Sequence, residues 1–492
     1  MRVNVRNAVR GGFYLDSVAL MRLSREIAAL SGVEDAALMM GTPANKAILA
    51  EAGLLDADGQ AAGANDLILA VRAQGAEAAD AALAAASLLL ERQPSAANAA
   101  ASHHPRSLRT ALGAQPGANL ALISVPGAYA AAEARKALSG GLDVMIFSDN
   151  VPLAEEVALK REGKALGRLV LGPDCGTAII AGTPLAFANR VPSGDIGLIG
   201  ASGTGLQEVS CLIAAAGRGI SHAIGVGSRD LGREVGGLST LAAIDLLDAD
   251  PATARIVVIS KPPHPEVVAA LLARVGRSRK RFTVCFLGAV AMHLPRNASA
   301  AATLSAAAED VLGAAIAPVT SPMPAARDGL ILGLYAGGSL AAEAQLVLIA
   351  AGRPVASNAA VPGASALEAA APRVDRIIDL GADEFTRGRP HPMIDPAVRS
   401  TKLRGALLDR GVAVILLDIV LGLGAHPDPA REVAAVLAGA PPDRPHLVAS
   451  VTGTEADPQV RSRQIATLNA AGVLLAPSNA RAAALAVDLA RG

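Results

Sequence analysis

The sequence predicts a multidomain α/β protein with mostly parallel sheets. Runs typical of buried strands alternate with alanine-rich runs typical of helices along most of the chain, which is the order expected when helices connect parallel strands. The chain has 492 residues, more than one hydrophobic core covers, so we expect several domains. A third observation is an internal duplication, because two long segments share residues at a constant spacing.

Residues 1–91 are expected to form a small α/β unit. The strand-like runs RVNVRNAV, DAALMMG and DLILAVRA alternate with helical segments at 16–30, 44–52 and 76–90. This order fits an α/β or an α+β unit, and the strand order stays open. Residues 92–117 are rich in Pro, Ser and Asn and predict an exposed linker. His103 and His104 lie in it, and such a pair in a polar linker is more often solvated than bound to metal.

Residues 118–192 are expected to form a second unit of three strands. The strands end in SVPG, FSDN and GPDCG, and in an open parallel sheet the ligand crevice lies at the carboxyl ends of the strands. Asp174 and Cys175 of the last turn are therefore candidate substrate-binding residues. Proline and glycine that only reverse the chain explain the same turns equally well.

Residues 193–315 and 328–492 are expected to be duplicated units. Gly203 matches Gly338, Glu208 matches Glu343, and the Gly-Arg pair at 217–218 matches the pair at 352–353. Each match is 135 residues apart. The second unit carries a longer insert before IIDLGADEF, which parallels AIGVGSRDL of the first. Two such units commonly pack about a pseudo-twofold axis, so the same segment of each is expected to meet the other.

Each duplicated unit has a glycine turn between a strand and a helix. The candidate phosphate-binding residues in these turns are Ser202, Gly203, Thr204 and Gly205 in the first, and Gly337, Gly338 and Ser339 in the second. Backbone N–H groups and the helix dipole favour an anion at a helix start. The spacing fits neither GxxxxGK[ST] nor GxGxxG. A tight turn chosen only for packing is the alternative interpretation.

Charged residues follow several of the predicted strands. Arg229 and Lys261 come after HAIGVG and RIVVIS, and as candidate catalytic cations they would neutralise a phosphate or carboxylate. The stiff segment GRPHPMIDP offers His391 as a further catalytic candidate, with Arg389 and Asp395 as candidate substrate-binding residues. Surface charge, and for His391 a structural role, are the competing interpretations.

Composition excludes several classes of function. There are 44 basic and 44 acidic residues, no tryptophan and 2% aromatic residues, so we expect no binding to nucleic acid or to a membrane surface. No apolar run approaches the roughly 20 residues of a spanning helix, and the first residues lack the continuous apolar core expected of a signal peptide. We expect a soluble, cytoplasmic protein. The three scattered cysteines predict neither disulfides nor a metal site.

Several motifs carry a family resemblance. RLVLGPDCG is similar to the GPNC turn of the succinyl-CoA synthetase α subunit, and the whole chain resembles the FdrA family through MMGTPANKAIL, MIFSDNV, LGPDCGTAIIAGTPLAFAN, GASGTG, SRDLGREVGG, SKPP, GRPHPMIDP and TGTEADPQ. The resemblance implies a Rossmann-like CoA-binding-type domain at 118–192. It also implies two flavodoxin-like domains, of the synthetase α type at 193–315 and of the β carboxyl type at 328–492.

The resemblance also implies an activity. The family is associated with an oxamate carbamoyltransferase of allantoin breakdown and is labelled acyl-CoA synthetase by similarity. The synthetases phosphorylate a histidine in a GHAGA-like loop, whereas this chain reads RFTVCFLGAVAMHLPRNASA there, with His293 in another context. Lys261 lies where the synthetases have an acidic residue. We therefore expect carbamoyl or acyl phosphate as substrate, no resident cofactor and no phosphohistidine, with partner subunits or self-association. A CoA ligase using ADP or ATP, and a non-catalytic scaffold subunit, remain alternatives.

Overall fold

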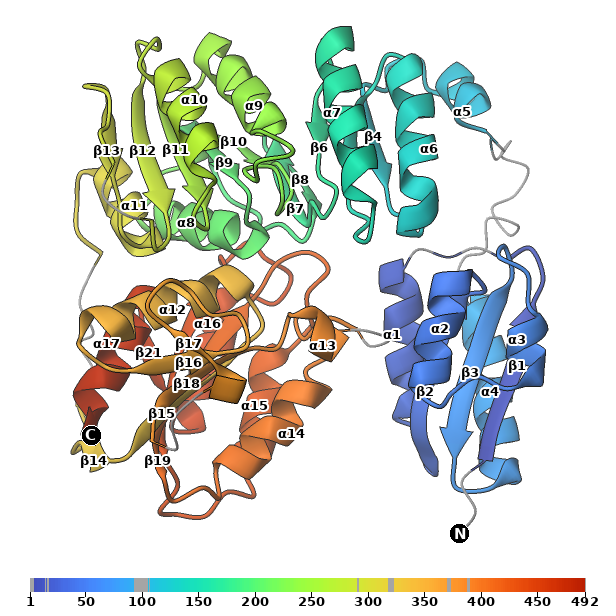
Figure 1. Ribbon diagram of the computed structural model, residues 1–492. Coiled ribbons are helices and arrows are strands. Elements are labelled where there is room, and N and C mark those ends of the chain that lie inside the picture. The colour runs from blue at the N-terminus through green and yellow to red at the C-terminus, as the bar shows by residue number, and fades with distance from the viewer. Residues whose placement is uncertain are drawn as a thin grey trace.

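The protein is described here from a computed structural model, which covers residues 4–13, 15, 17–92, 105, 107–289, 292–316, 323–369, 373–386 and 390–491. Four α/β units are visible in Figure 1, with the two duplicated units stacked on one side and the two smaller units beside them. Within these ranges no helix has both the length and the apolar character needed to cross a membrane.

The first unit is an α+β fold rather than a parallel one. Its central strand β3 pairs antiparallel with both neighbours in the order β1-β3-β2. Alternate residues of β3 face two small cores, one under α1 and α4 and the other under α2, as the period of two in a strand requires. The elements are β1 (Asn4–Arg10), α1 (Ser17–Ala28), β2 (Val33–Met40), α2 (Pro43–Glu51), α3 (Ala57–Ala61), β3 (Leu67–Ala73) and α4 (Ala76–Arg92).

The second unit has the expected parallel sheet, in the order β4-β5-β6. A helix, α5, occupies part of the segment expected to be a linker. Ser107 and Thr110 form a capping box at its start, and Leu108 and Leu112 pack on the core of this unit. His103 and His104 lie outside the described residues. The elements are α5 (Leu108–Ala114), β4 (Leu120–Ile123), α6 (Gly127–Ser139), β5 (Asp143–Ile146), α7 (Leu153–Leu166) and β6 (Val170–Leu171).

The first duplicated unit, here called the first half, is a seven-stranded sheet in the order β13-β12-β11-β9-β10-β7-β8. Its sheet begins before residue 193, because the hairpin β7–β8 joins it antiparallel to β10. The elements are β7 (Thr177–Ile180), β8 (Thr183–Ala186), β9 (Ser193–Gly200), α8 (Gly203–Ala215), β10 (Ile220–Gly225), α9 (Leu238–Ala249), β11 (Arg255–Ser260), α10 (Pro265–Val275), β12 (Arg281–Phe286), β13 (Ala298–Ala300) and α11 (Leu304–Leu312).

The second half repeats this plan in the order β17-β16-β18-β15-β19-β20-β21. The central strand β15 has β18 and β19 beside it, as β9 has β10 and β11, so β16 and β17 are the expected insert. The elements are β14 (Arg327–Asp328), β15 (Leu330–Tyr335), α12 (Gly338–Ala350), β16 (Val355–Ser357), β17 (Ser365–Ala366), the 3-10 helix η1 (Leu367–Ala369), β18 (Asp375–Asp379), α13 (Asp383–Thr386), α14 (Ala397–Ala406), β19 (Val412–Val420), α15 (Pro429–Leu437), β20 (His446–Thr452), α16 (Arg461–Ala470), β21 (Leu474–Ala476), α17 (Asn479–Leu489) and β22 (Ala490–Arg491).

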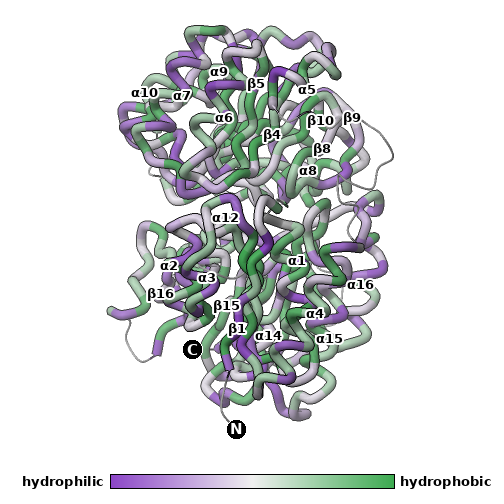
Figure 2. The backbone as a smooth tube through the Cα atoms, turned by 90° about the vertical axis from the view of Figure 1, so that its right-hand side faces the viewer, coloured by the Kyte–Doolittle hydropathy of each residue, from purple (hydrophilic) through white to green (hydrophobic). Residues whose placement is uncertain are grey.

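One hydrophobic core joins the two halves. It contains apolar side chains of α8 and α11 from the first half and of α12 and α17 from the second. Figure 2 shows the tube mostly hydrophobic along the strands, with hydrophilic segments mainly on outer loops and helix ends. Because α8 packs on α12, the starts of these two helices lie at the same junction.

Candidate functional site

The two glycine turns meet, as the duplication predicts. The hydroxyl groups of Ser202 and Ser339 are 2.5 Å apart, one from each half. A Cβ built on Gly337 would stand 3.0 Å from the methyl carbon of Thr204. This junction of two helix starts is called the paired turn below.

The first turn has free backbone donors. The hydroxyl of Ser202 caps α8 by accepting the N–H of Gly205 at 2.9 Å. Among the described residues the N–H groups of Ser202, Gly203 and Thr204 have no hydrogen-bond partner. These three N–H groups can receive an anion, and the α8 dipole favours one there.

The second turn is already filled by an internal anion. Asp418, at the end of β19, accepts the N–H groups of Ala336 at 2.8 Å and Gly337 at 2.7 Å. Its side chain is fully buried, and the guanidinium of Arg399 donates to its backbone oxygen and lies 3.5 Å from its carboxylate. Burial raises the pKa of Asp418, and Arg399 opposes that shift. The N–H of Gly337 is therefore not available to a substrate, and sequence reasoning did not identify Asp418.

A pocket of about 230 Å³ opens between residues of the two halves. It is lined by Lys261, Pro262 and residues 359–362. The side chain of Lys261 is exposed, and within the described chain it forms no ion pair. Lys261 thus presents a positive charge between the two halves.

Asp379 is a second carboxylate at this junction that sequence reasoning missed. It ends β18, and a Cβ built on Gly338 would stand 2.8 Å from its Oδ2 atom. Burial raises its pKa to about 6, while Lys261 lowers it. A sequence signal for both carboxylates existed, because Asp379 and Asp418 each come directly after a run of apolar residues.

His391 lies near Asp379. Its Nδ1 accepts the N–H of Met393 at 3.2 Å, and a Cβ built on Gly381 would meet its Nε2 at 2.7 Å and Asp379 Oδ1 at 3.2 Å. Burial lowers the pKa of His391 to about 4, so the ring is neutral near pH 7.

The other two candidates of this segment are not placed at the paired turn. Asp395 caps Ala397 at 3.0 Å and lies 3.8 Å from Arg25 of the first unit, so its contacts join two units. Arg389 lies outside the described residues.

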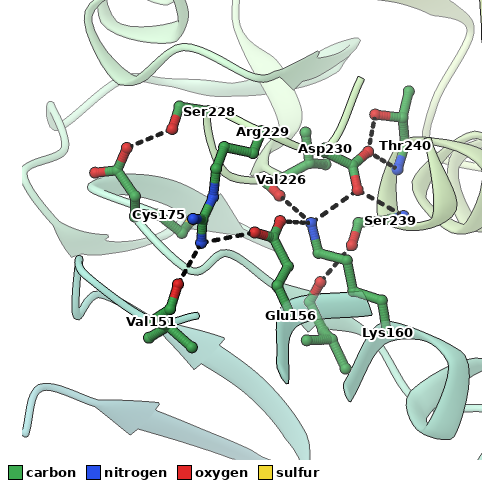
Figure 3. Close-up of polar contacts among 12 residues, drawn as sticks. Val151, Glu156, Lys160, Cys175, Val226, Ser228, Arg229, Asp230, Ser239 and Thr240 are labelled. Atoms are coloured by element: carbon green, nitrogen blue, oxygen red, sulfur yellow. Dashed lines mark hydrogen bonds and ion pairs between the residues drawn. The ribbon is translucent and has the colours of Figure 1, made fainter. Parts of the chain in front are cut away.

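The remaining candidates lie at a different junction, between the second unit and the first half. Figure 3 shows the guanidinium of Arg229 between Val151 and Glu156. It donates to the Val151 oxygen at 2.8 Å and lies 2.9 Å from the fully buried Glu156 carboxylate. Lys160 bridges Glu156 and Asp230, at 2.8 Å from each. Through these contacts Arg229 links the first half to the second unit.

Asp174 and Cys175 flank the same junction. Asp174 accepts the hydroxyl of Ser228 at 2.6 Å. Cys175 is buried, and its thiol lies 3.2 Å from the Gly225 oxygen. Burial raises the pKa of this thiol to about 12, so any substrate contact in this turn belongs to its backbone or to Asp174 rather than to a thiolate.

Three segments of the chain match known protein families. Residues 1–106 match a family described as an AllF, heavy metal-associated domain, residues 192–286 a CoA binding domain, and residues 334–489 a CoA-ligase domain. The chain is 37% identical to the protein YahF of Escherichia coli K12, over 98% of each chain.

More distant relatives match only part of the chain. The succinate–CoA ligase [ADP-forming] subunit alpha-2 of Trichomonas vaginalis is 29% identical over 38% of this chain and 62% of its own length. The ADP-forming sulfoacetate-CoA ligase subunit SauD of Bilophila wadsworthia is 27% identical over 29% of this chain and 50% of its own. This chain thus spans half to under two thirds of those two relatives.

The first unit does not offer the donors of a heavy-metal site. Its match is to a heavy metal-associated domain, yet the three cysteines of the chain are Cys175, Cys211 and Cys285, all outside residues 1–106. Among the described residues no group of three or more His, Cys, Asp or Glu side chains is placed to hold an ion. Since soft metals select thiolate ligands, we derive no step through a metal.

The match to a CoA binding domain covers residues 192–286 and not the second unit. In its β4–α6 turn a Cβ on Gly127 would stand 2.2 Å from the backbone oxygen of Asp149. The glycine is thus required where two turns of the chain pack together, and we assign no CoA-binding residue.

Proposed function

Because the chain belongs to the FdrA family of succinyl-CoA synthetase-like proteins, we propose that it transfers a carbamoyl or acyl group from an acyl phosphate. In the carbamoyl case the acceptor is oxamate, as in allantoin breakdown, and partner subunits complete the enzyme. The observation that carries the proposal is the first turn, where free N–H groups lie at the same junction as the unpaired Lys261.

The phosphate of the donor binds at the first turn. The N–H groups of Ser202, Gly203 and Thr204 surround it, and Lys261 supplies a positive charge. Asp418 already holds two N–H groups of the second turn, so that turn contributes only Gly338 and Ser339. As the acyl carbon–oxygen bond breaks, charge builds on the leaving phosphate, and fixed donors aimed at that charge stabilise the transition state.

No phosphohistidine is needed in this reaction. His293 is exposed on the loop after β12, and His391 comes from the other half with its Nδ1 already bonded. His391 acts as a neutral group that orients the acceptor. Arg229 and Asp174 act at the neighbouring junction, where Arg229 fixes the second unit against the first half.

The test is carbamoyl transfer from carbamoyl phosphate to oxamate with partner subunits present. Removing one preorganised donor commonly costs about 10²–10³-fold in kcat, so Lys261→Ala is expected to lose activity on that scale. Ser202→Ala keeps the backbone N–H but removes the hydroxyl that caps α8, so it is expected to lower kcat by less. Lys136→Ala, an exposed lysine paired with Glu133, is the control. Full activity in both junction variants would reject the site, and an inactive wild-type complex would reject the function.

A CoA ligase using ADP or ATP is the second candidate, favoured by the CoA-binding and CoA-ligase matches. Incubation with radiolabelled ATP separates the two, because a ligase of this type forms an acid-labile phosphoenzyme. Labelled protein would support the ligase. Tight complex formation whose activity is indifferent to junction variants would support a scaffold subunit.

A further inference from the structure

We propose that Asp379 accepts the proton of the attacking acceptor group during transfer, an inference that rests on the proposed function. Its carboxylate lies at the start of α12, where a Cβ built on Gly338 would stand 2.8 Å from Oδ2. None of the matches assigns a role to this residue.

The surroundings of Asp379 hold its carboxylate in one orientation. Its Oδ1 accepts the N–H of Gly381 at 2.9 Å. Its backbone is fixed by Asn358, which accepts the Asp379 N–H at 2.9 Å and donates to the Asp379 oxygen at 2.9 Å. With Oδ1 and the backbone fixed, the direction of Oδ2 is fixed as well.

The other carboxylate oxygen, Oδ2, differs from Oδ1 in its hydrogen bonding. Within the described chain it has no hydrogen-bond donor, although it lies close to Gly338. A structural cap of α12 would accept an N–H of Gly338 or Ser339, and Asp379 accepts neither. Asp379 as a whole is 6% exposed. A carboxylate oxygen that is held in place and has no hydrogen-bond partner is suited to take a proton from a bound reactant.

Three charged groups act on Asp379, each from a different part of the chain. Lys261 follows β11 and favours the ionised form, while Asp418 at the end of β19 and Glu384 of α13 disfavour it. The neutral His391 faces the same space at Gly381. Burial is the largest effect and raises the pKa of Asp379 to about 6, so most of the group is ionised near pH 7 and its basicity suits neutral conditions.

The transfer forms one C–N bond and breaks one C–O bond. The acceptor nitrogen attacks the carbonyl carbon with its electron pair and forms the new C–N bond. The bond between that carbon and the phosphate oxygen breaks, and phosphate leaves with the electron pair to the first turn. The nitrogen proton passes to Oδ2 of Asp379 and then to solvent. An amide nitrogen such as that of oxamate is a weak nucleophile, so removal of its proton is required in the transition state.

The experiment is a pH profile of carbamoyl transfer by the complete complex with wild-type, Asp379→Asn and Asp379→Glu chains. General-base assistance contributes about 10²–10⁴-fold, so Asp379→Asn is expected to lose kcat on that scale while KM for carbamoyl phosphate changes little. Wild-type kcat rises with pH through about 6, because the ionised form is needed. The Asn variant lacks this rise, and the Glu variant keeps it with lower kcat.

Controls separate the possible failures. Asp488→Asn, an exposed carboxylate of α17, is expected to leave the rate and profile unchanged. An Asp379→Asn complex with wild-type kcat and profile would overturn the role of Asp379 while the proposed function stands. A wild-type complex without transfer would overturn both. If the Asn variant does not fold, the Glu variant decides, since an unchanged kcat there with no pH limb near 6 contradicts the inference.

Discussion

The two halves share one architecture and differ in what fills the start of the central helix. In the first half Gly200 of β9 lies opposite Ile259 of β11. In the second half the position equivalent to Gly200 is Tyr335, and the residue of β19 next after the Leu334–Leu417 pair is Asp418. An apolar side chain in one half is thus replaced by a carboxylate in the other. Both halves thus bring a helix start to their junction, and in the second half an internal carboxylate occupies the N–H groups of that start.

A second pair of residues has remained equivalent. Glu208 of α8 accepts the N–H of Asn479 at 3.0 Å, at the start of α17 in the second half. Glu343 of α12 accepts the N–H of Leu304 at 2.6 Å, at the start of α11 in the first half. Each glutamate therefore caps the last helix of the opposite half, where an anion stabilises the helix start. These crossed caps lock the halves together.

The largest expected effect comes from removing the internal anion. Asp418→Ala leaves the buried Arg399 without its carboxylate and two N–H groups without an acceptor, which costs about 3–5 kcal/mol in free energy of unfolding. Chemical unfolding measures it. The control is Asp195→Ala, whose exposed pair with Arg218 is worth about 0–1 kcal/mol. Equal effects of the two variants would contradict the role given to Asp418.

The crossed caps should give the next largest effect. Glu208→Ala and Glu343→Ala each leave buried donors unpaired, at about 1–3 kcal/mol apiece. If the caps lock the halves, both variants destabilise α11 and α17 together, which hydrogen exchange of the two helices would show. Exchange that rises in only one half would argue against a shared lock.

Glu343 also carries a pH signature. Burial and the nearby Glu208 raise its pKa from 4.5 to about 7. As pH rises across this window the unfolded state loses the proton first, so this group lowers the free energy of unfolding progressively and the loss is complete above about 7. Glu343→Gln removes that term. The stability difference between variant and wild type should therefore shift in favour of the variant as pH rises, and a difference independent of pH would contradict this.

The hydroxyl pair of the paired turn gives a smaller, asymmetric effect. Ser202 caps Gly205, so Ser202→Ala costs about 1 kcal/mol. The second helix has Gly337 at the cap position and no side-chain cap, so Ser339→Ala should change stability by less than about 0.5 kcal/mol. Thermal unfolding of both variants tests this, and equal losses would mean that the two turns are built alike.

The contacts that attach the first unit to the second half should contribute least to the free energy of unfolding. Arg25 lies 3.8 Å from Asp395 and 3.7 Å from Glu432 and is one-third exposed. Arg25→Ala is expected to cost less than about 1 kcal/mol and to leave the two halves unchanged, as limited proteolysis between the units would reveal. A loss as large as that of the crossed caps would mean that this unit is part of the same core.

Sequence alone determined the α/β class, the duplication and the meeting of the two glycine turns. It could do so because strand periodicity and a constant spacing are local properties, and because a repeat predicts that like segments meet. The strand-end argument was applied to both Lys261 and Arg229. Lys261 lies between the two halves, whereas Arg229 contacts the second unit, so a strand end alone did not decide which junction a residue reaches.

Only the tertiary structure decided which helix start is open. Asp418 reaches Gly337 across 81 residues, and Glu208 reaches Asn479 across 271. Neither contact is visible in a local pattern, because each depends on which strand lies beside which and on how the halves pack. The antiparallel first sheet likewise depends on pairing that helical and strand periodicity do not encode. Which residues meet over such separations depends on how the whole core packs. The sequence alone therefore does not show that Asp418 and Asp379 lie at the paired turn.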